Sequence, residues 1–223
     1  MLNIHCLHSA NSNIAVFEAA RRRLGHRQLM LKHRVRSDLL AAAETIGAPT
    51  PEILEKTAAE LRLLARGGDA VLLTCSTLGQ AVPRAARDLP MPVLRVDEAL
   101  AAAAVAAGGP VIALCAAGST TGPTRLLFER VAMASGASVE VRLVPGAWEA
   151  FRAGDTARYF ALVAEAADGA AAEGATVALA QASMAGAVPL VRRQPPPLAS
   201  PDVGLAAALA AAEAYAVSGA AQP

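Results

Sequence analysis

The sequence predicts an α/β protein made of two similar lobes, each with a parallel sheet, and a cleft between them. Three observations predict it. Short apolar runs alternate with helical patterns of about 10 to 16 residues along the 223-residue chain. Most of the runs lack a strict alternation of apolar and polar residues, which is typical of parallel strands covered by helices on both faces. The first half of the chain also aligns with the second.

The expected strands are short runs rich in β-branched residues or Leu. They lie at 2–7, 28–35, 69–74, 91–96, 109–115, 138–144 and 175–180. Helical patterns lie at 13–25, 50–68, 84–88, 96–109, 124–136 and 155–174, and a proline-rich loop leads to a last helix at about 203–217. Several helical segments open on Ser, Thr or Asp and close on Gly, which suits N-caps and C-caps.

An internal repeat relates the two halves of the chain. The segment ELRLLARGGDAVLLTCSTLG lies over AADGAAAEGATVALAQASMAG without a gap, which places Cys75 on Gln181. The first strand repeats as well, with LNIHCLHSAN over VIALCAAGST and Cys6 on Cys115. Self-similarity of this kind indicates two copies of one structural unit.

The repeat predicts a first lobe at 1–100 and a second lobe at 101–223, with the last helix able to pack back on the first lobe. Ligands of open parallel sheets bind outside the carboxyl ends of the strands. Two facing lobes would therefore bring four loops to one cleft, at residues 9–13, 75–77, 119–121 and 181–183. Their hydroxyls, amides and backbone N–H groups, close to helix N-termini, suit a carboxylate or another small anion.

Composition excludes several kinds of partner. The formal net charge is +1 and aromatic residues make up 3% of the chain, so we expect neither nucleic acid nor an anionic membrane as partner. No segment reaches the roughly 18 apolar residues of a membrane span, and the N-terminus has no signal-peptide pattern. The sequence predicts a cytoplasmic protein that binds a small molecule, with three cysteines that need not form disulfides.

Four motifs stand at the predicted loops. They are HSANSN after the first strand, LLTCSTLGQA around Cys75, GSTTGPTRLLFERVAMASG at the start of the second lobe, and LAQASMAGAVPL around Gln181. Together they resemble the aspartate/glutamate/hydantoin racemase superfamily, which also includes maleate isomerase and arylmalonate decarboxylase. The resemblance covers most of the chain. It implies Rossmann-like or flavodoxin-like lobes, a small carboxylic acid as substrate, no metal, pyridoxal or nucleotide cofactor, and a homodimer as a common assembly.

The resemblance also implies roles for thiols. In such racemases one cysteine removes the α-proton as a thiolate, and a second returns it from the opposite face as a thiol. Cys75 matches the first position and is the expected catalytic residue, whereas Gln181 stands where many relatives have the second cysteine. A neutral amide can donate or accept hydrogen bonds, but it cannot take or give a proton at neutral pH as a thiol can. One thiol fits a cofactor-independent isomerase or one-base racemase, and two alternatives are an arylmalonate-type decarboxylase and a non-catalytic carboxylate-binding protein.

Further loop side chains are candidate substrate contacts. They are Asn11, Ser76, Thr77, Thr120, Thr121, Gln181 and Ser183, with His8 and Ser9 as additional candidates. Each also has a structural interpretation. Asn11 suits a helix N-cap, Gln181 can brace a loop, and Cys75 can be a buried thiol that packs as a small apolar residue. Cys6 and Cys115 lie inside strand runs, which favours packing in the core.

The stretch HCLH raises the question of a metal site. Side chains alternate along a strand, so only Cys6 and His8 can share a face. Two ligands do not make a metal site. His33 lies among arginines and is expected to be solvated. We therefore expect no metal ligands in this sequence.

Overall fold

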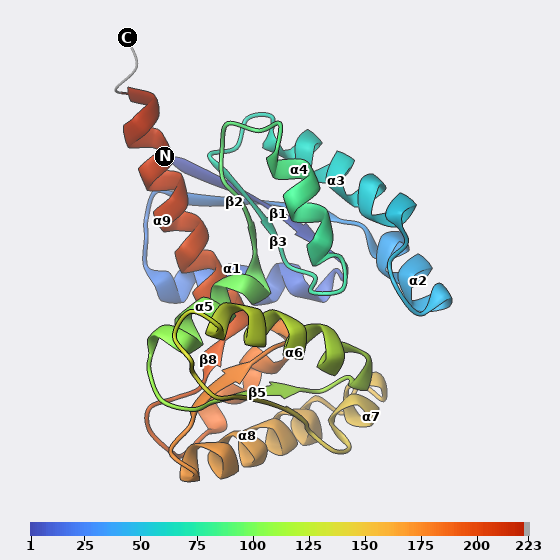
Figure 1. The fold of residues 1–223 in the computed structure, drawn as a ribbon, viewed down its shortest axis with the longest axis vertical. Helices are drawn as coiled ribbons and strands as arrows, with labels where there is room; N and C mark the ends of the chain where they lie inside the picture. The colour runs from blue at the N-terminus through green and yellow to red at the C-terminus, as the bar shows by residue number, and fades with distance from the viewer. Residues whose placement is uncertain (221–223) are drawn as a thin grey trace. The chain divides into compact units, whose positions relative to one another are not determined.

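The computed structural model describes residues 1–220, which form two compact α/β units (Figure 1). The first unit contains Met1–Val96 and the residues from Gly204 onward, and the second contains Asp97–Val203. Within the described part of the chain, no helix is long and apolar enough to cross a membrane.

The first unit has a four-stranded parallel sheet of order β2-β1-β3-β4. Its strands are β1 (Leu2–His8), β2 (Leu29–Val35), β3 (Ala70–Leu73) and β4 (Val93–Arg95). Its helical elements are α1 (Ser12–Leu24), α2 (Ser37–Ile46), α3 (Pro51–Ala65), the short 3-10 turn η1 (Gly79–Ala81), α4 (Val82–Ala86) and most of α9 (Ser200–Ala220).

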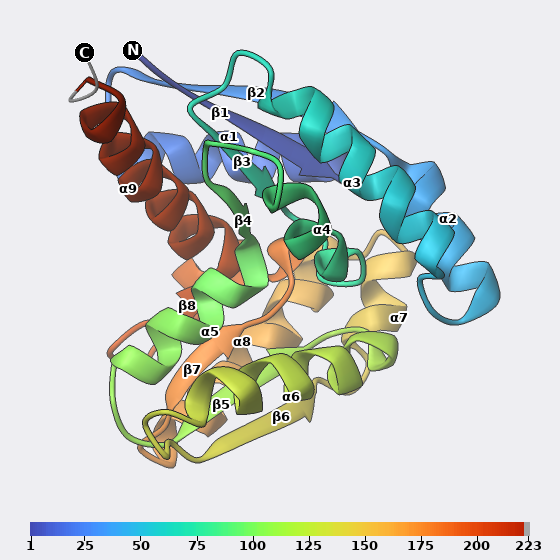
Figure 2. The same cartoon turned by 45° about the horizontal axis from the view of Figure 1, so that its top comes forward.

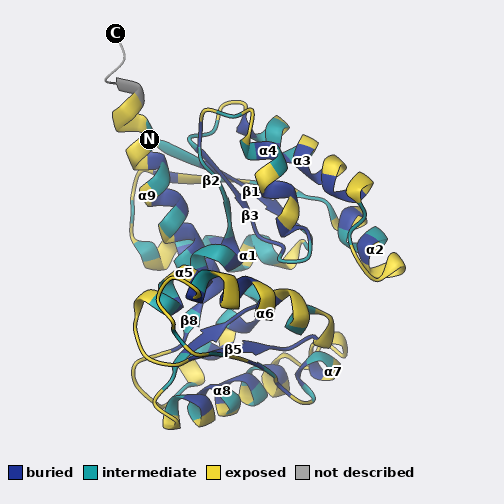
Figure 3. Ribbon diagram, viewed as in Figure 1, coloured by how far each residue is buried: buried dark blue, intermediate teal, exposed yellow. Residues whose placement is uncertain are grey.

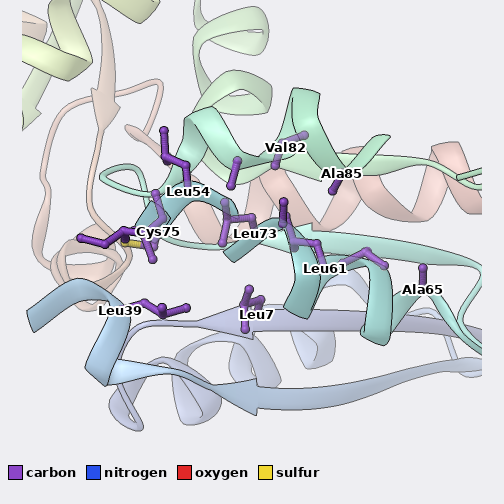
Figure 4. Packing of buried hydrophobic residues seen from close by; sticks show 14 of the residues in the cluster. Leu7, Leu39, Leu54, Leu61, Ala65, Leu73, Cys75, Val82 and Ala85 are labelled. Atoms are coloured by element: carbon purple, nitrogen blue, oxygen red, sulfur yellow. The ribbon is translucent and has the colours of Figure 1, made fainter. Parts of the chain in front are cut away.

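Helices cover both faces of this sheet (Figure 2). Leu7 and Leu73 pack with Leu61 of α3 in an apolar cluster that also receives side chains from α2 and α4 (Figure 4). His8, next to Leu7 in the chain, points to the other face, where its ring centroid lies 5.3 Å from that of Phe17 in α1. Because both faces are covered, these strands do not need the alternating pattern of a half-exposed sheet.

The second unit repeats this topology with the strand order β6-β5-β7-β8, again all parallel. Its strands are β5 (Val111–Cys115), β6 (Val139–Leu143), β7 (Thr176–Leu179) and β8 (Leu198–Ala199). Its helical elements are α5 (Val96–Ala106), α6 (Gly118–Ala132), α7 (Ala147–Arg152), α8 (Thr156–Ala172) and the 3-10 segment η2 (Ala182–Leu190).

The core of the second unit also lies on both faces of its sheet. Leu114 of β5 packs with Val163 of α8 on one face. Its neighbour Cys115 packs with Leu100 of α5 and Phe128 of α6 on the other. Figure 3 shows β5 buried and the outer faces of the helices exposed. Successive side chains of β5 point to opposite faces of the sheet, so this apolar strand packs against a layer of helices on each face.

Local chemistry accounts for several helix ends. At the start of α3, the Thr50 hydroxyl oxygen accepts a hydrogen bond from the Ile53 N–H at 3.3 Å, and Pro51 occupies the first turn. At the start of α8, an Asp155 carboxylate oxygen accepts from the Arg158 N–H at 3.1 Å. Helix α1 ends at Gly25, whose φ of 70° lies in the left-handed region that glycine tolerates.

Each expected strand overlaps an observed strand, and both units have the same strand order, as the internal repeat predicts. The elements that were not predicted include a helix and a short strand. Helix α2 follows β2 directly, and β8 is a two-residue strand at the end of the proline-rich segment. One boundary was wrong, because α6 begins at Gly118 rather than near Thr124. Thr120 and Thr121 therefore lie in the first turn of a helix and not in a loop.

Candidate functional site

Cys75 lies in the turn that follows β3, at the carboxyl end of a central strand. Its side chain is buried, at 7% exposure, and it joins the apolar cluster near Leu39 and Leu54 (Figure 4). The next two residues, Ser76 and Thr77, are half-buried. The turn therefore holds a thiol at the border between the core and a short row of hydroxyl groups.

Arg95 is a residue near this turn that the sequence reasoning missed. It ends β4, and the sheet register pairs it with Leu73, two residues before Cys75. A Cβ atom added to Gly79 would collide with the Arg95 guanidinium, so the guanidinium approaches the backbone of the turn because residue 79 is glycine. The sequence signal that could have indicated this residue is a single charge, at position 95, inside the apolar run at 91–96. A guanidinium here can bind a carboxylate through two hydrogen bonds.

His8 begins a hydrogen-bonded chain of side chains on the α1 face of the sheet. Its Nδ1 lies 2.8 Å from the Thr74 hydroxyl, and its Nε2 lies 2.8 Å from Nδ1 of His33. Nε2 of His33 lies 3.2 Å from Glu18, which is bonded to Arg21 at 2.9 Å. Burial, together with the neighbouring His33, lowers the pKa of His8 to about 3, so this imidazole is neutral at pH 7.

His33 corrects an expectation from the sequence. It was expected to be solvated, but its side chain is only 13% exposed and contacts His8 and Glu18. The argument against a metal cluster considered only Cys6 and His8. In the structure, the ligand atoms of Cys6, His8 and His33 all lie within 4.8 Å of one another. Cys6 is fully buried, and burial with the nearby Glu18 charge raises the pKa of its thiol to about 12.

The loop between β1 and α1 contributes its polar residues at the surface. Ser9 is half-buried and Asn11 is exposed. Asn11 precedes α1, yet its side chain makes no capping hydrogen bond. The N-cap interpretation of Asn11 is therefore wrong, and its amide faces solvent at the carboxyl edge of β1.

In the second unit, Gln181 follows β7 as Cys75 follows β3, separated from the strand by one residue. Its side-chain oxygen accepts hydrogen bonds from the backbone N–H groups of Ala116 and Ala117, at 2.6 and 3.0 Å. Those two residues form the turn between β5 and α6. Gln181 thus braces this turn and presents its NH2 group as a further hydrogen-bond donor.

The remaining polar candidates of the second unit have local partners. The hydroxyls of Thr120 and Thr121 donate to the backbone oxygens of Ala117 and Gly118, at 2.7 and 2.8 Å. The Ser183 hydroxyl lies 2.8 Å from the Tyr159 hydroxyl. Burial raises the pKa of Tyr159 to about 12, so the Tyr159 side chain is a neutral hydrogen-bonding group at pH 7.

The other two cysteines lie in the core. Cys115 ends β5 and is fully buried, with its thiol 3.7 Å from the Thr124 hydroxyl. Burial raises the pKa of the Cys115 thiol. Cys6 is buried to the same degree in β1. Among the described residues, which include every cysteine, no disulfide joins these thiols.

Each unit thus offers a different set of groups at the carboxyl ends of its strands. The first has the Cys75 thiol, the hydroxyls of Ser76 and Thr77, and the Arg95 guanidinium. The second has the braced amide of Gln181 and hydroxyls, with no cysteine in the matching turn. Of these groups, the reactive thiol candidate and the positive charge therefore both lie in the first unit.

Comparisons with solved structures give the same fold at low sequence identity. An allantoin racemase from Klebsiella pneumoniae matches with a TM-score of 0.71 and 13% identity, over 98% of this chain and 89% of that one. An aspartate racemase homologue from Pyrococcus horikoshii matches at 0.67 and 14%, over 96% and 100%. Glutamate racemase from Thermus thermophilus, in complex with β-chloro-D-alanine, matches at 0.60 and 20%, over 96% and 81%.

The comparison with curated protein sequences finds no match. A family model described as Asp/Glu/Hydantoin racemase matches residues 9–211, which is most of the chain. This match includes the Cys75 turn, the first turn of α6 and the Gln181 segment. The chain therefore belongs to the Asp/Glu/hydantoin racemase family.

Proposed function

We propose that this protein is a cofactor-independent racemase that acts at the α-carbon of a small carboxylic acid, with Cys75 as the acid/base. The observation that carries the proposal is the Cys75 turn. It places a thiol at the carboxyl end of a central strand and brings the Arg95 guanidinium against the backbone of the same turn, in a chain of the racemase family.

The chemistry follows from these groups. The Cys75 thiolate takes the α-proton, the C–H bond breaks, and its electron pair moves into the carboxylate to give an enolate-like intermediate. The Arg95 guanidinium is the candidate counter-charge for that carboxylate, and the hydroxyls of Ser76 and Thr77 are further donors. Stabilising charge as it develops is the largest single contribution in many enzymes of this kind.

The second half of the reaction differs from a symmetric mechanism. Return of the proton from Cys75 to the same face gives exchange without inversion. Inversion requires that water protonate the opposite face or that the intermediate turn over before the proton returns. Gln181 cannot take this role, because its amide is neither an acid nor a base at neutral pH and its oxygen accepts from two backbone N–H groups.

Proton exchange at the α-carbon tests the proposal. The protein is incubated in D2O with aspartate, glutamate, allantoin, hydantoins, 2-arylpropionates, arylmalonates and maleate, and each compound is followed by NMR and by chiral chromatography. We expect deuterium incorporation with at least one of the panel's racemisable carboxylic acids, which are aspartate, glutamate and the 2-arylpropionates, and slower inversion than exchange. Loss of carbon dioxide from an arylmalonate without exchange elsewhere would identify a decarboxylase instead.

Two variants make the test specific. Cys75→Ala should lower the exchange rate by about 10²- to 10⁴-fold, the usual contribution of a general acid/base. Cys115→Ala is the matched control, because it removes a buried thiol outside the turn, and it should keep the wild-type rate. Arg95→Gln should raise KM more than it lowers kcat if the guanidinium binds the substrate carboxylate. Equal exchange in wild type and Cys75→Ala would refute the role of the thiol.

A further inference from the structure

Three potential metal ligands meet on the α1 face of the first sheet. Cys6 and His8 are two residues apart on β1, so their side chains point to the same face. The parallel register pairs Cys6 with His33 of β2, which adds a third side chain to that face. Their sulfur and nitrogen atoms lie within 4.8 Å of one another. The third ligand comes from a different strand and is therefore invisible to a local sequence pattern.

The hydrogen bonds around the two imidazoles determine which nitrogen of each ring can bind an ion. The Thr74 hydroxyl donates to the backbone oxygen of Leu7 at 3.1 Å, so the Thr74 oxygen is free to accept from Nδ1–H of His8. A Glu18 carboxylate oxygen accepts from Nε2–H of His33. The remaining nitrogens, Nε2 of His8 and Nδ1 of His33, face each other at 2.8 Å.

The two facing nitrogens can therefore bind one cation that enters between them. The arrangement has the features of metal-binding histidines in proteins. In those sites each imidazole binds the ion through one nitrogen and donates its other N–H to a carboxylate, carbonyl or hydroxyl partner. Here both outer partners are in place, Thr74 for His8 and Glu18 for His33.

We propose that Cys6, His8 and His33 form a binding site for a divalent ion of the zinc type. One thiolate and two imidazoles are a ligand set that Zn²⁺ prefers, and three protein ligands leave the fourth tetrahedral position to water or another small ligand. Zn–N bonds of about 2.0–2.1 Å place two tetrahedral nitrogens about 3.3 Å apart. The two imidazoles therefore separate by about 0.5 Å when the ion enters.

When the ion binds, the Cys6 thiol loses its proton to solvent and becomes a thiolate ligand. The thiolate and the nearby Glu18 carboxylate together match the two positive charges of the ion, so binding adds no uncompensated charge to this buried region.

Cobalt binding tests the ligand set without any activity assay, so the result is independent of the racemase proposal. The full chain is titrated with Co²⁺, which gives a thiolate-to-cobalt charge-transfer band in the near ultraviolet and strong visible bands in a tetrahedral site. We expect both bands to saturate at one equivalent and to disappear when Zn²⁺ is added. Failure to saturate at one equivalent would overturn the proposal.

Cysteine variants identify which thiol binds. Cys6→Ala should lose the charge-transfer band, whereas Cys75→Ala and Cys115→Ala should keep it. A band that is lost in Cys75→Ala and kept in Cys6→Ala would place the ion at the other thiol and overturn the proposal. If Cys6→Ala does not fold, His33→Gln replaces it, since this side chain lies at the edge of the cluster. His33→Gln should keep the thiolate band and weaken zinc affinity by at least 10-fold.

A further measurement tests the outer partner of His33. Glu18→Gln should weaken zinc binding by about 10- to 100-fold, the usual effect of changing an outer partner of a ligating histidine. Unchanged zinc affinity in Glu18→Gln would overturn the arrangement of ligands.

Discussion

Removal of the Gln181 side chain should destabilise the protein through two backbone N–H groups. In Gln181→Ala, the Ala116 and Ala117 N–H groups lose the oxygen that accepts from them at 2.6 and 3.0 Å. Both alanines are buried, at 1% and 3% exposure. A buried donor left without a partner costs about 1–3 kcal/mol. Gln181 itself is half-buried, so its removal lets water reach the two N–H groups and offset part of this cost. We therefore expect the free energy of unfolding to fall by about 2 kcal/mol for the two groups together.

That loss is large enough to measure. For a chain of 223 residues, about 2 kcal/mol corresponds to a decrease in Tm of roughly 4–8 °C. Urea unfolding gives the free energy of unfolding, and calorimetry gives Tm. The matched control is Gln181→Glu, whose carboxylate also accepts from both N–H groups and lies close to the N-terminus of α6, where negative charge is favourable. We expect Gln181→Glu to be at least as stable as wild type at pH 7.

Two outcomes would refute this reasoning. If Gln181→Ala kept the wild-type free energy of unfolding to within about 0.5 kcal/mol, the side-chain oxygen would not brace the turn between β5 and α6. If Gln181→Glu were as unstable as Gln181→Ala, acceptance by a side-chain oxygen at position 181 would not be what stabilises this turn.

Two other predictions concern the core and the surface. Leu61 is fully buried, so Leu61→Ala should lower the free energy of unfolding, measured in urea, by about 2–5 kcal/mol. Leu63 is 52% exposed, so Leu63→Ala should change that free energy by less than about 0.5 kcal/mol. Similar losses at both positions would contradict the observed packing. Arg142 lowers the pKa of Glu140 and Glu173, so its stabilising effect is present above their unfolded pKa near 4.5 and is lost as the pH falls through the lowered values. Arg142→Met should therefore have a lower Tm than wild type at pH 7 and a smaller difference below pH 4, and a difference that grows in acid would contradict this assignment.

The strands and the repeat could be predicted because their signals are local. Each strand is a compact apolar run, and helices of sufficient length separate the runs. Two copies of such a series leave an ungapped alignment that places Cys75 on Gln181, and the structure has the same sheet order in both units. The two-residue strand β8 could not be predicted, since its pairing with β7 depends on tertiary packing rather than on a run of its own.

The details of the site could not be predicted, because they depend on which residues of separate strands become neighbours. The pairing of Cys6 with His33 follows from the register of two parallel strands, and a parallel register is not encoded in either strand alone. The approach of Arg95 to Gly79 depends on the absence of a Cβ atom at the point where β4 ends. Sequence reasoning found the thiol and the hydroxyls of the turn but not the charge beside it.

The bracing role of Gln181 also explains why a thiol would not be a simple replacement at this position. A cysteine at 181 would supply the second proton donor of a symmetric racemase, but sulfur is a weak acceptor. The N–H groups of Ala116 and Ala117 would then need another partner. In this chain, position 181 has an amide in place of a proton donor. The oxygen of the same amide accepts hydrogen bonds from the turn that precedes α6. Asymmetry of the two units is therefore built into the hydrogen bonding of the second unit, and it favours the one-thiol chemistry that we propose for Cys75.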